Sequence, residues 1–119
     1  MKFDLKVMVE DDFGKKFEFD IARIDRKNLT LESLGLTLAE GKTILGQIQQ
    51  IMATAQSSHY VEEQRRCNEC QKTPALKGHH DLVIRTVFGK LRLDSPGLYA
   101  CKCRYGEEKS YSPLAMAFY

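Results

Sequence analysis

The sequence predicts an α+β fold, in which an N-terminal β-hairpin and one long helix precede a small β-sheet. Three observations predict it. Two stretches within residues 2–24 alternate apolar and polar side chains, as strands do. Residues 38–64 carry apolar side chains at helical spacing, and all four cysteines flank a second alternating stretch. We expect a hairpin and amphipathic helix in residues 1–64, a cysteine-bound sheet in 65–105 and a tail in 106–119.

The N-terminal hairpin is predicted by two alternating runs, residues 2–10 and 16–24. The apolar positions of these runs are Phe3, Leu5, Val7, Val9, Phe17, Phe19 and Ile21. Between the runs, residues 11–14 (DDFG) have the composition of a turn. Because an isolated hairpin is marginal in water, we expect its apolar face to pack on another element. We also expect the leucines of the connector, residues 25–36, to lie under the hairpin.

The long helix is predicted over about residues 38–64. Thr37 and Glu40 have the spacing of a capping box, in which each side chain accepts a hydrogen bond from the other residue's backbone amide. Apolar side chains then follow at helical spacing, at Ile44, Ile48, Ile51 and Met52. A helix of this length suits two arrangements, covering the hairpin or pairing with a copy of itself, and the sequence favours neither.

Two glycines, Gly41 and Gly46, interrupt the helical pattern. Each weakens a helix by roughly 1 kcal/mol relative to alanine. Because a glycine has no side chain, we expect these positions to permit the close approach of a strand or a second helix.

The cysteines form two close pairs, Cys67 and Cys70 as C-x-x-C and Cys101 and Cys103 as C-x-C. Two short loops that each present two thiolates suit one tetrahedral zinc ion. The residues between the pairs alternate like strands, so the pairs are expected to meet at one end of a small sheet. The sequence therefore predicts a zinc ribbon with a structural zinc ion.

Other interpretations of the cysteines remain open, namely four free thiols or two disulfides. His79 and His80 are alternative metal ligands, although four thiolates already complete a closed structural site. The first thirteen residues (MKFDLKVMVEDDF) contain early acids and no continuous apolar stretch, so we expect no secretory signal. A cytoplasmic protein with reduced cysteines follows from this expectation.

Three strands are expected between the cysteine pairs. Residues 80–87 alternate and form the first strand, and 90–94 run back after a turn at Phe88-Gly89. The sequence Ser95-Pro96-Gly97 has turn chemistry and is expected to lead into a third strand over residues 98–101.

Charge is unevenly distributed along the chain. Residues 1–63 carry 8 Lys and Arg against 11 Asp and Glu, whereas residues 64–119 carry 10 against 5, a net charge of +5. A basic zinc ribbon favours a polyanionic partner, nucleic acid above all, and the alternative is a solvated basic face. The expected DNA contacts are Arg65, Arg66, Lys77, Arg85, Lys90, Arg92, Lys102 and Arg104. Alternation with apolar neighbours, Val87 among them, would place Arg85 and Arg92 on one face.

The sequence contains no motif of a known catalytic site. It has no Gly-rich phosphate loop, no nucleophile elbow and no H-E-x-x-H. The acids of the basic half are too scattered to form a two-metal site. We therefore expect a protein that is not an enzyme.

Several segments, taken together in order and spacing, resemble the N-terminal region of the ISKra-type family of bacterial insertion-sequence transposases. They are residues 34–43 (LGLTLAEGKT), the first cysteine pair, Lys77-Gly78, residues 85–96 (RTVFGKLRLDSP), Tyr99 to Cys103, and residues 112–115 (SPLA). The resemblance covers nearly the whole chain. The chain departs from the pattern at Gly97, where the family has a basic residue.

The resemblance implies recognition of transposon-end DNA in the cytoplasm, in association with the nucleoid. Members of the family continue into an acidic-triad (DDE) nuclease domain, and this chain stops before such a domain. We therefore expect a fragment or a truncated stand-alone relative. The alternative function is an interaction module. In it, the helix over residues 38–64 and the hairpin face mediate dimerisation or pairing with a full-length transposase, which the module would regulate.

Overall fold

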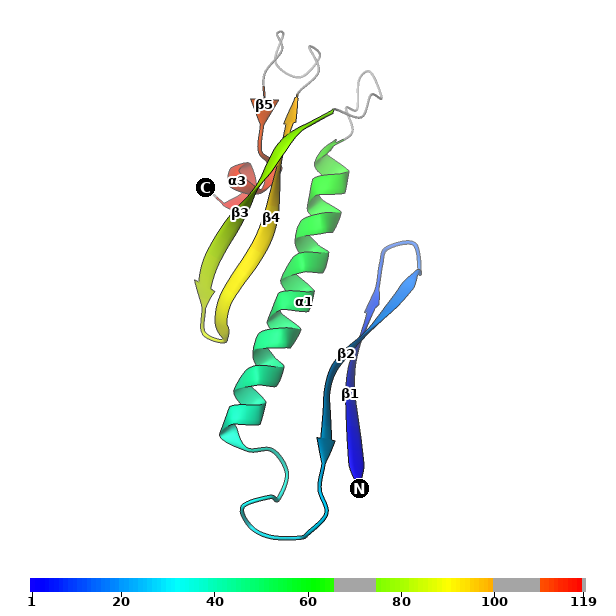
Figure 1. The fold of residues 1–119 in the computed structure, drawn as a ribbon. Coiled ribbons are helices and arrows are strands. Elements are labelled where there is room, and N and C mark those ends of the chain that lie inside the picture. Colours follow the sequence, from blue (N-terminus) through cyan, green and yellow to red (C-terminus); the bar gives the residue numbers. More distant parts are fainter. Residues whose placement is uncertain (66–74, 100–109, 119) are drawn as a thin grey trace. The chain divides into compact units, whose positions relative to one another are not determined.

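The computed structural model describes residues 1–65, 75–99 and 110–118 and confirms the predicted α+β class. It contains an N-terminal β-hairpin, one long helix and a three-stranded sheet (Figure 1). By contacts the chain divides into two compact units, unit 1 (Met1–Ile51 with Val87–Gly89) and unit 2 (Met52–Thr86 with Lys90–Tyr119). The predicted three-part division stays a prediction. None of the described helices combines the length and apolar character needed to cross a membrane.

The predicted hairpin is confirmed in unit 1, where β1 (Lys2–Glu10) pairs antiparallel with β2 (Lys16–Asp25). Leu5 pairs with Ala22, but Lys6 pairs with Asp20, so Ile21 is an extra residue in a β-bulge. The bulge shifts the alternation of β2 by one residue. The paired apolar positions are therefore Phe3, Leu5, Val7 and Val9 opposite Ile24, Ala22, Phe19 and Phe17, and Ile21 is not among them.

The turn between the strands is held by the Asp11 carboxylate. Its Oδ1 accepts hydrogen bonds from the backbone amides of Phe13 at 2.9 Å and Lys15 at 2.8 Å. Gly14 has a φ of 83°, which glycine adopts without steric cost. The predicted turn over residues 11–14 is thereby confirmed.

Opposite charges face each other across the polar side of the hairpin. Four directly opposite pairs are Lys2 with Asp25, Asp4 with Arg23, Lys6 with Asp20, and Glu10 with Lys16. Lys6 also lies 2.9 Å from Glu18, and this hydrogen bond and charge raise the pKa of Lys6 above its usual value. Because cross-strand pairs of opposite charge are favourable and like pairs are not, this pattern selects the observed register.

The connector after β2 is organised by Arg26. Its guanidinium donates to the backbone oxygens of Ser33 at 3.0 Å and Gly35 at 3.2 Å, and it forms an ion pair with Glu40. The prediction that the connector leucines lie under the hairpin is wrong, since they are between 57% and 88% exposed at Leu29, Leu31, Leu34 and Leu36. Polar contacts to Arg26 fix the connector, and its leucines are left in solvent.

The long helix α1 (Leu38–Arg65) confirms the predicted element. It begins with the predicted capping box, because the Glu40 amide donates to Thr37 Oγ1 at 3.1 Å and the Thr37 amide donates to Glu40 Oε1 at 2.9 Å. Among the predicted apolar positions, Ile44 is buried and Met52 is 50% exposed. The apolar positions of the helix are therefore only partly covered.

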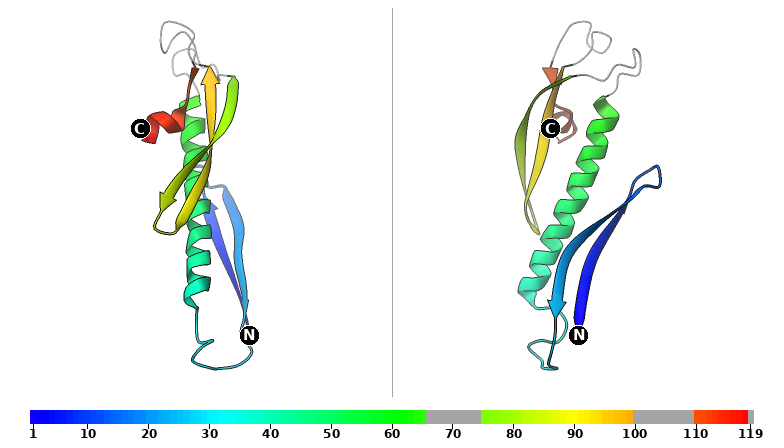
Figure 2. Two further views of the ribbon diagram at one scale, coloured as in Figure 1. Left: turned by 60° about the vertical axis from the view of Figure 1, so that its left-hand side comes forward. Right: turned by 45° about the vertical axis from the view of Figure 1, so that its right-hand side comes forward.

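Unit 2 contains a sheet in the order β3-β4-β5, formed by β3 (Leu76–Thr86), β4 (Gly89–Tyr99) and β5 (Ser110–Tyr111), with helix α3 (Pro113–Phe118) after it (Figure 2). The predicted turn at Ser95-Pro96-Gly97 is wrong, because β4 runs through these residues. Burial explains the difference. Ser95 and Pro96 are buried, as are Leu93 and Leu98 on either side of them along β4, so tertiary packing overrides local turn chemistry. The third strand is β5, not residues 98–101.

The close approach predicted at a helical glycine occurs at Gly46, in unit 1. A Cβ atom built on this residue would lie 3.0 Å from the backbone oxygen of Phe88, in the turn between β3 and β4. A Cβ built on Gly41 meets nothing within 4 Å.

Gly46→Ala and Gly41→Ala should therefore have opposite effects on stability. Both remove the helical cost of glycine, about 1 kcal/mol. In Gly46→Ala, however, the new methyl group presses on the Phe88 carbonyl, and such overpacking typically costs about 1–3 kcal/mol. In urea unfolding, Gly41→Ala should stabilise the protein and Gly46→Ala should not. Equal stabilisation by both substitutions would show that the turn does not approach the helix at Gly46.

The Glu40 carboxylate should make the stability of unit 1 depend on pH. Its hydrogen bond from the Thr37 amide, followed by that from Arg26, lowers the pKa of Glu40 below the ordinary 4.5. The resulting stabilisation is present above that ordinary value and is lost as the pH falls through the lowered one. The difference in unfolding free energy between the wild type and Glu40→Gln should thus shrink on acidification. A difference that is independent of pH would contradict the assignment.

Candidate functional site

The four predicted zinc ligands, Cys67, Cys70, Cys101 and Cys103, lie outside the described residues. So do three predicted DNA contacts, Arg66, Lys102 and Arg104. The candidate site is therefore built from the residues of unit 2 at which the cysteine-bearing segments begin and end.

The residues that flank these segments are tied together by a set of contacts, here called the clasp. The Tyr99 amide donates to the Ala75 oxygen at 3.1 Å, so the end of β4 is joined to the residue before β3. Tyr99 also pairs with Ser110, at the start of β5. The Tyr111 hydroxyl donates to the Gln64 oxygen at 3.1 Å, which joins β5 to the end of α1. Every described end of the two segments thus belongs to, or adjoins, one connected group.

The clasp adjoins the buried core of unit 2. Leu98 is fully buried and Leu114 is 1% exposed, and Pro113 is also fully buried. Ser95 of β4, which is fully buried, shares a hydrogen bond of 2.9 Å with Ser112, the residue before α3. These contacts place β5 and α3 against the same strand that ends in the clasp.

A hollow of about 470 Å³ lies beside the clasp. Its lining is Lys77, Gly78, His79, His80, Gly97, Ser110, Tyr111 and Ser112. Lys77 Nζ lies 3.1 Å from Ser110 Oγ, and His79 Nδ1 lies 2.9 Å from the Asp94 carboxylate. His79, an alternative metal ligand by sequence, is therefore engaged with a carboxylate of β4.

The predicted cations of the sheet lie in solvent. Arg85, Lys90 and Arg92 are exposed, whereas their neighbours Leu91 and Leu93 are buried. Val87 was expected on the apolar side and is 96% exposed, so that expectation is wrong: Val87 comes two residues after the exposed Arg85, on the same side of the alternation, and lies in the turn after β3. The carboxylates Asp81 and Asp94 are also exposed on these strands, so the exposed face carries both signs of charge.

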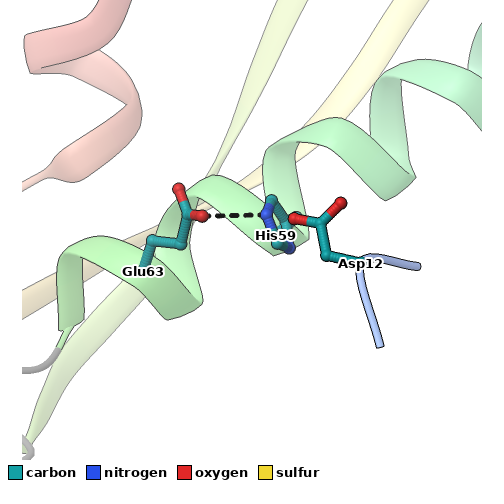
Figure 3. A group of neighbouring side chains, drawn as sticks. All are labelled: Asp12, His59 and Glu63. Atoms are coloured by element: carbon teal, nitrogen blue, oxygen red, sulfur yellow. Dashed lines mark ion pairs between the residues drawn. The ribbon is translucent and has the colours of Figure 1, made fainter. Parts of the chain in front are cut away.

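The remaining predicted contact residues are placed separately. Lys77 is exposed at the hollow, and Arg65 is the last residue of α1. Near the same end of α1, His59 Nε2 lies 2.9 Å from the Glu63 carboxylate, and the two exposed side chains are separated by one helical turn (Figure 3). Such pairs support a helix by a few tenths of a kcal/mol, and this one belongs to the helix surface.

Sequence analysis missed β5 and α3, because residues 106–119 were interpreted as a tail. A signal for α3 is present, since Ser112 followed by Pro113 is a typical helix start. The Met116 amide donates to the Ser112 oxygen at 3.1 Å, as expected for the first turn. The role of Tyr111 leaves no signal in the sequence, because its partner Gln64 is 47 residues away.

Comparison with known proteins gives no match: no family model matches the chain, and neither does a curated protein or a solved structure.

Removing the Tyr111 hydroxyl should weaken the clasp. Tyr111→Phe loses the bond to Gln64 and leaves a part-buried carbonyl without that donor, which costs about 1 kcal/mol in urea unfolding. Tyr99→Phe is the matched control, because it removes the same group from a side chain that is 51% exposed. If both variants lose the same stability, the bond to Gln64 does not hold the clasp.

Proposed function

We propose that this protein is a zinc-ribbon DNA-binding module of an ISKra-type transposase or of a truncated relative. In this proposal it recognises transposon-end DNA in the nucleoid and does not catalyse strand transfer. The resemblance of the sequence and the geometry of the clasp support the proposal. The clasp is the single observation that carries it.

The clasp joins the described residues from which both cysteine-bearing segments continue. Cys67 follows the described residue Arg65 by two positions, and Cys101 follows Tyr99 by two. A chain of two residues spans at most about 7 Å, so we propose that thiolates from both segments reach one zinc ion near the residues that the clasp joins. A four-thiolate site needs such convergence of two distant segments, whereas unrelated free thiols do not.

A zinc ion would supply stability that the sheet lacks. The buried apolar residues of unit 2 are few, namely Leu91, Leu93, Pro96, Leu98, Pro113 and Leu114 among the described residues. Small domains with so little core are commonly completed by a metal, and binding of the metal is then part of folding. Four thiolates from Cys67, Cys70, Cys101 and Cys103 would close the end of the sheet beyond the clasp.

The exposed face of β3 and β4 is the proposed DNA surface. Arg85, Lys90 and Arg92 project from it, on the opposite side from buried Leu91 and Leu93. The backbone of Phe88 approaches Gly46, which argues against deep entry of the turn into a groove. We therefore propose that the face, rather than the turn, contacts phosphates, and that Lys77 and the cations flanking the cysteines add further contacts.

The second candidate is an interaction module, favoured by the incomplete burial of α1. Leu45 is 44% exposed and Met52 is 50% exposed, so apolar helix surface remains for a second copy or for a full-length transposase. Pairing with a full-length transposase would then regulate transposition by forming mixed assemblies that cannot react.

A salt-dependent DNA titration tests the first proposal. Zinc-loaded protein is titrated with a labelled transposon-end duplex and with a scrambled duplex, at several salt concentrations. Arg85→Ala combined with Arg92→Ala should weaken binding and reduce the log–log salt slope by about 2, because each lost phosphate contact removes about 0.9.

Lys27→Ala combined with Lys42→Ala is the matched control. It removes the same charge from exposed residues of unit 1 and should leave the slope nearly unchanged. If the Arg85 and Arg92 variant keeps both the affinity and the slope of the wild type, this face does not contact DNA.

A further inference from the structure

The edge of β1 that faces away from β2 presents the backbone groups of every second residue. Met1 and Arg26 exchange backbone hydrogen bonds at 2.9 and 3.0 Å, and the Asp11 amide donates to the Lys15 oxygen at 2.9 Å. In an antiparallel pair these bonds occur at alternate residues, so the odd-numbered residues of β1 bond to β2. The backbone groups of the even-numbered residues face away from β2. They are Lys2, Asp4, Lys6, Met8 and Glu10.

β1 offers the more regular of the two edges. Within the described residues the hairpin is a two-stranded sheet, so both of its strands are edges. The bulge at Ile21 shifts the outward-facing positions in the middle of β2, and bulges are a common way to block an edge. β1 has no such interruption among its own residues.

Charge selects a single register if β1 pairs antiparallel with β1 of a second copy. Three registers, centred on residue 5, 6 or 7, pair at least seven residues of β1 (Lys2–Glu10) in each copy and bring outward residues opposite one another. Centring on residue 6 opposes Lys6 to Lys6, and centring on residue 7 opposes Asp4 to Glu10. Centring on Leu5 opposes Asp4 to Lys6 twice, with no like charges opposed.

The Leu5-centred register also continues the charge pattern of each hairpin. Asp20 lies opposite Lys6 and Arg23 lies opposite Asp4 within one chain. Across two copies the row becomes Asp20, Lys6, Asp4, Arg23, in which the sign alternates at every step. The same row occurs twice, related by the twofold axis.

The apolar face is completed by the same register. Phe3 of one copy comes opposite Val7 of the other, and Leu5 comes opposite Leu5. Phe3 is 48% exposed, and Phe17 and Phe19 are each 42% exposed, so the face has apolar surface left to bury. A four-stranded sheet with one apolar face is also far more stable than an isolated two-stranded hairpin.

We propose that the β1 edge binds a second copy of this chain, in an antiparallel pair centred on Leu5, to form a continuous four-stranded sheet. The proposed interface is formed by β1 and not by helix α1. It depends neither on zinc nor on DNA.

Two charge-swap variants test this register while keeping an opposite pair across β1 and β2 at the exchanged positions. Asp4→Lys with Arg23→Asp, and Lys6→Asp with Asp20→Lys, each restore an opposite pair across β1 and β2, and neither alters the net charge. In the proposed dimer the first variant places a lysine at position 4 opposite Lys6, and the second places an aspartate at position 6 opposite Asp4. Each variant should therefore dimerise at least about tenfold more weakly than the wild type.

An equimolar mixture of the two variants should restore dimerisation, because both interchain pairs are then of opposite charge. Sedimentation velocity gives the association, and native mass spectrometry shows whether the restored species is the heterodimer. Circular dichroism and urea unfolding confirm that each variant is folded. A monomeric wild type, variants that dimerise like the wild type, or a mixture that stays monomeric would each overturn the proposal.

Discussion

Unit 2 depends on the clasp that joins Gln64, Ala75, Tyr99, Ser110 and Tyr111. β5 is only two residues long, so the ladder alone offers few hydrogen bonds to fix the chain after the second cysteine pair. The Tyr111 hydroxyl and the buried Ser95–Ser112 contact add side-chain bonds between segments far apart in the sequence. Together with the buried Leu98, Pro113 and Leu114, these contacts hold the described residues that flank the two cysteine pairs to one end of the sheet.

Unit 1 is organised by charge more than by a core. Arg26 links the end of β2 to the connector and to Glu40, which is itself part of the capping box of α1. Pairs of opposite charge on one face fix the hairpin register. On the other face, the side chains of Phe3, Phe17 and Phe19 remain about half exposed. A hairpin specified by charge and left with an open apolar face is suited to adding further strands, and the same charge rule indicates which strand.

Local signals predicted the elements, and non-local contacts decided the rest. The capping box at Thr37 and Glu40 and the turn at residues 11–14 depend on neighbours within four residues, so the sequence displays them. The bulge at Ile21 and the extension of β4 through Pro96 depend on packing across the sheet, which no short pattern encodes. The roles of the cysteines and of Arg85 and Arg92 are inferences from spacing and charge, to which the clasp adds a physical frame.

X-ray absorption at the zinc edge tests the central claim most directly, because it reports the ligands of the metal itself. A single site formed by Cys67, Cys70, Cys101 and Cys103 should give one bound zinc with four sulfur neighbours at about 2.3 Å. Zinc bound by nitrogen and oxygen ligands, or purified protein with four reactive thiols and no stoichiometric zinc, would contradict the account. In that case the clasp would serve the fold alone.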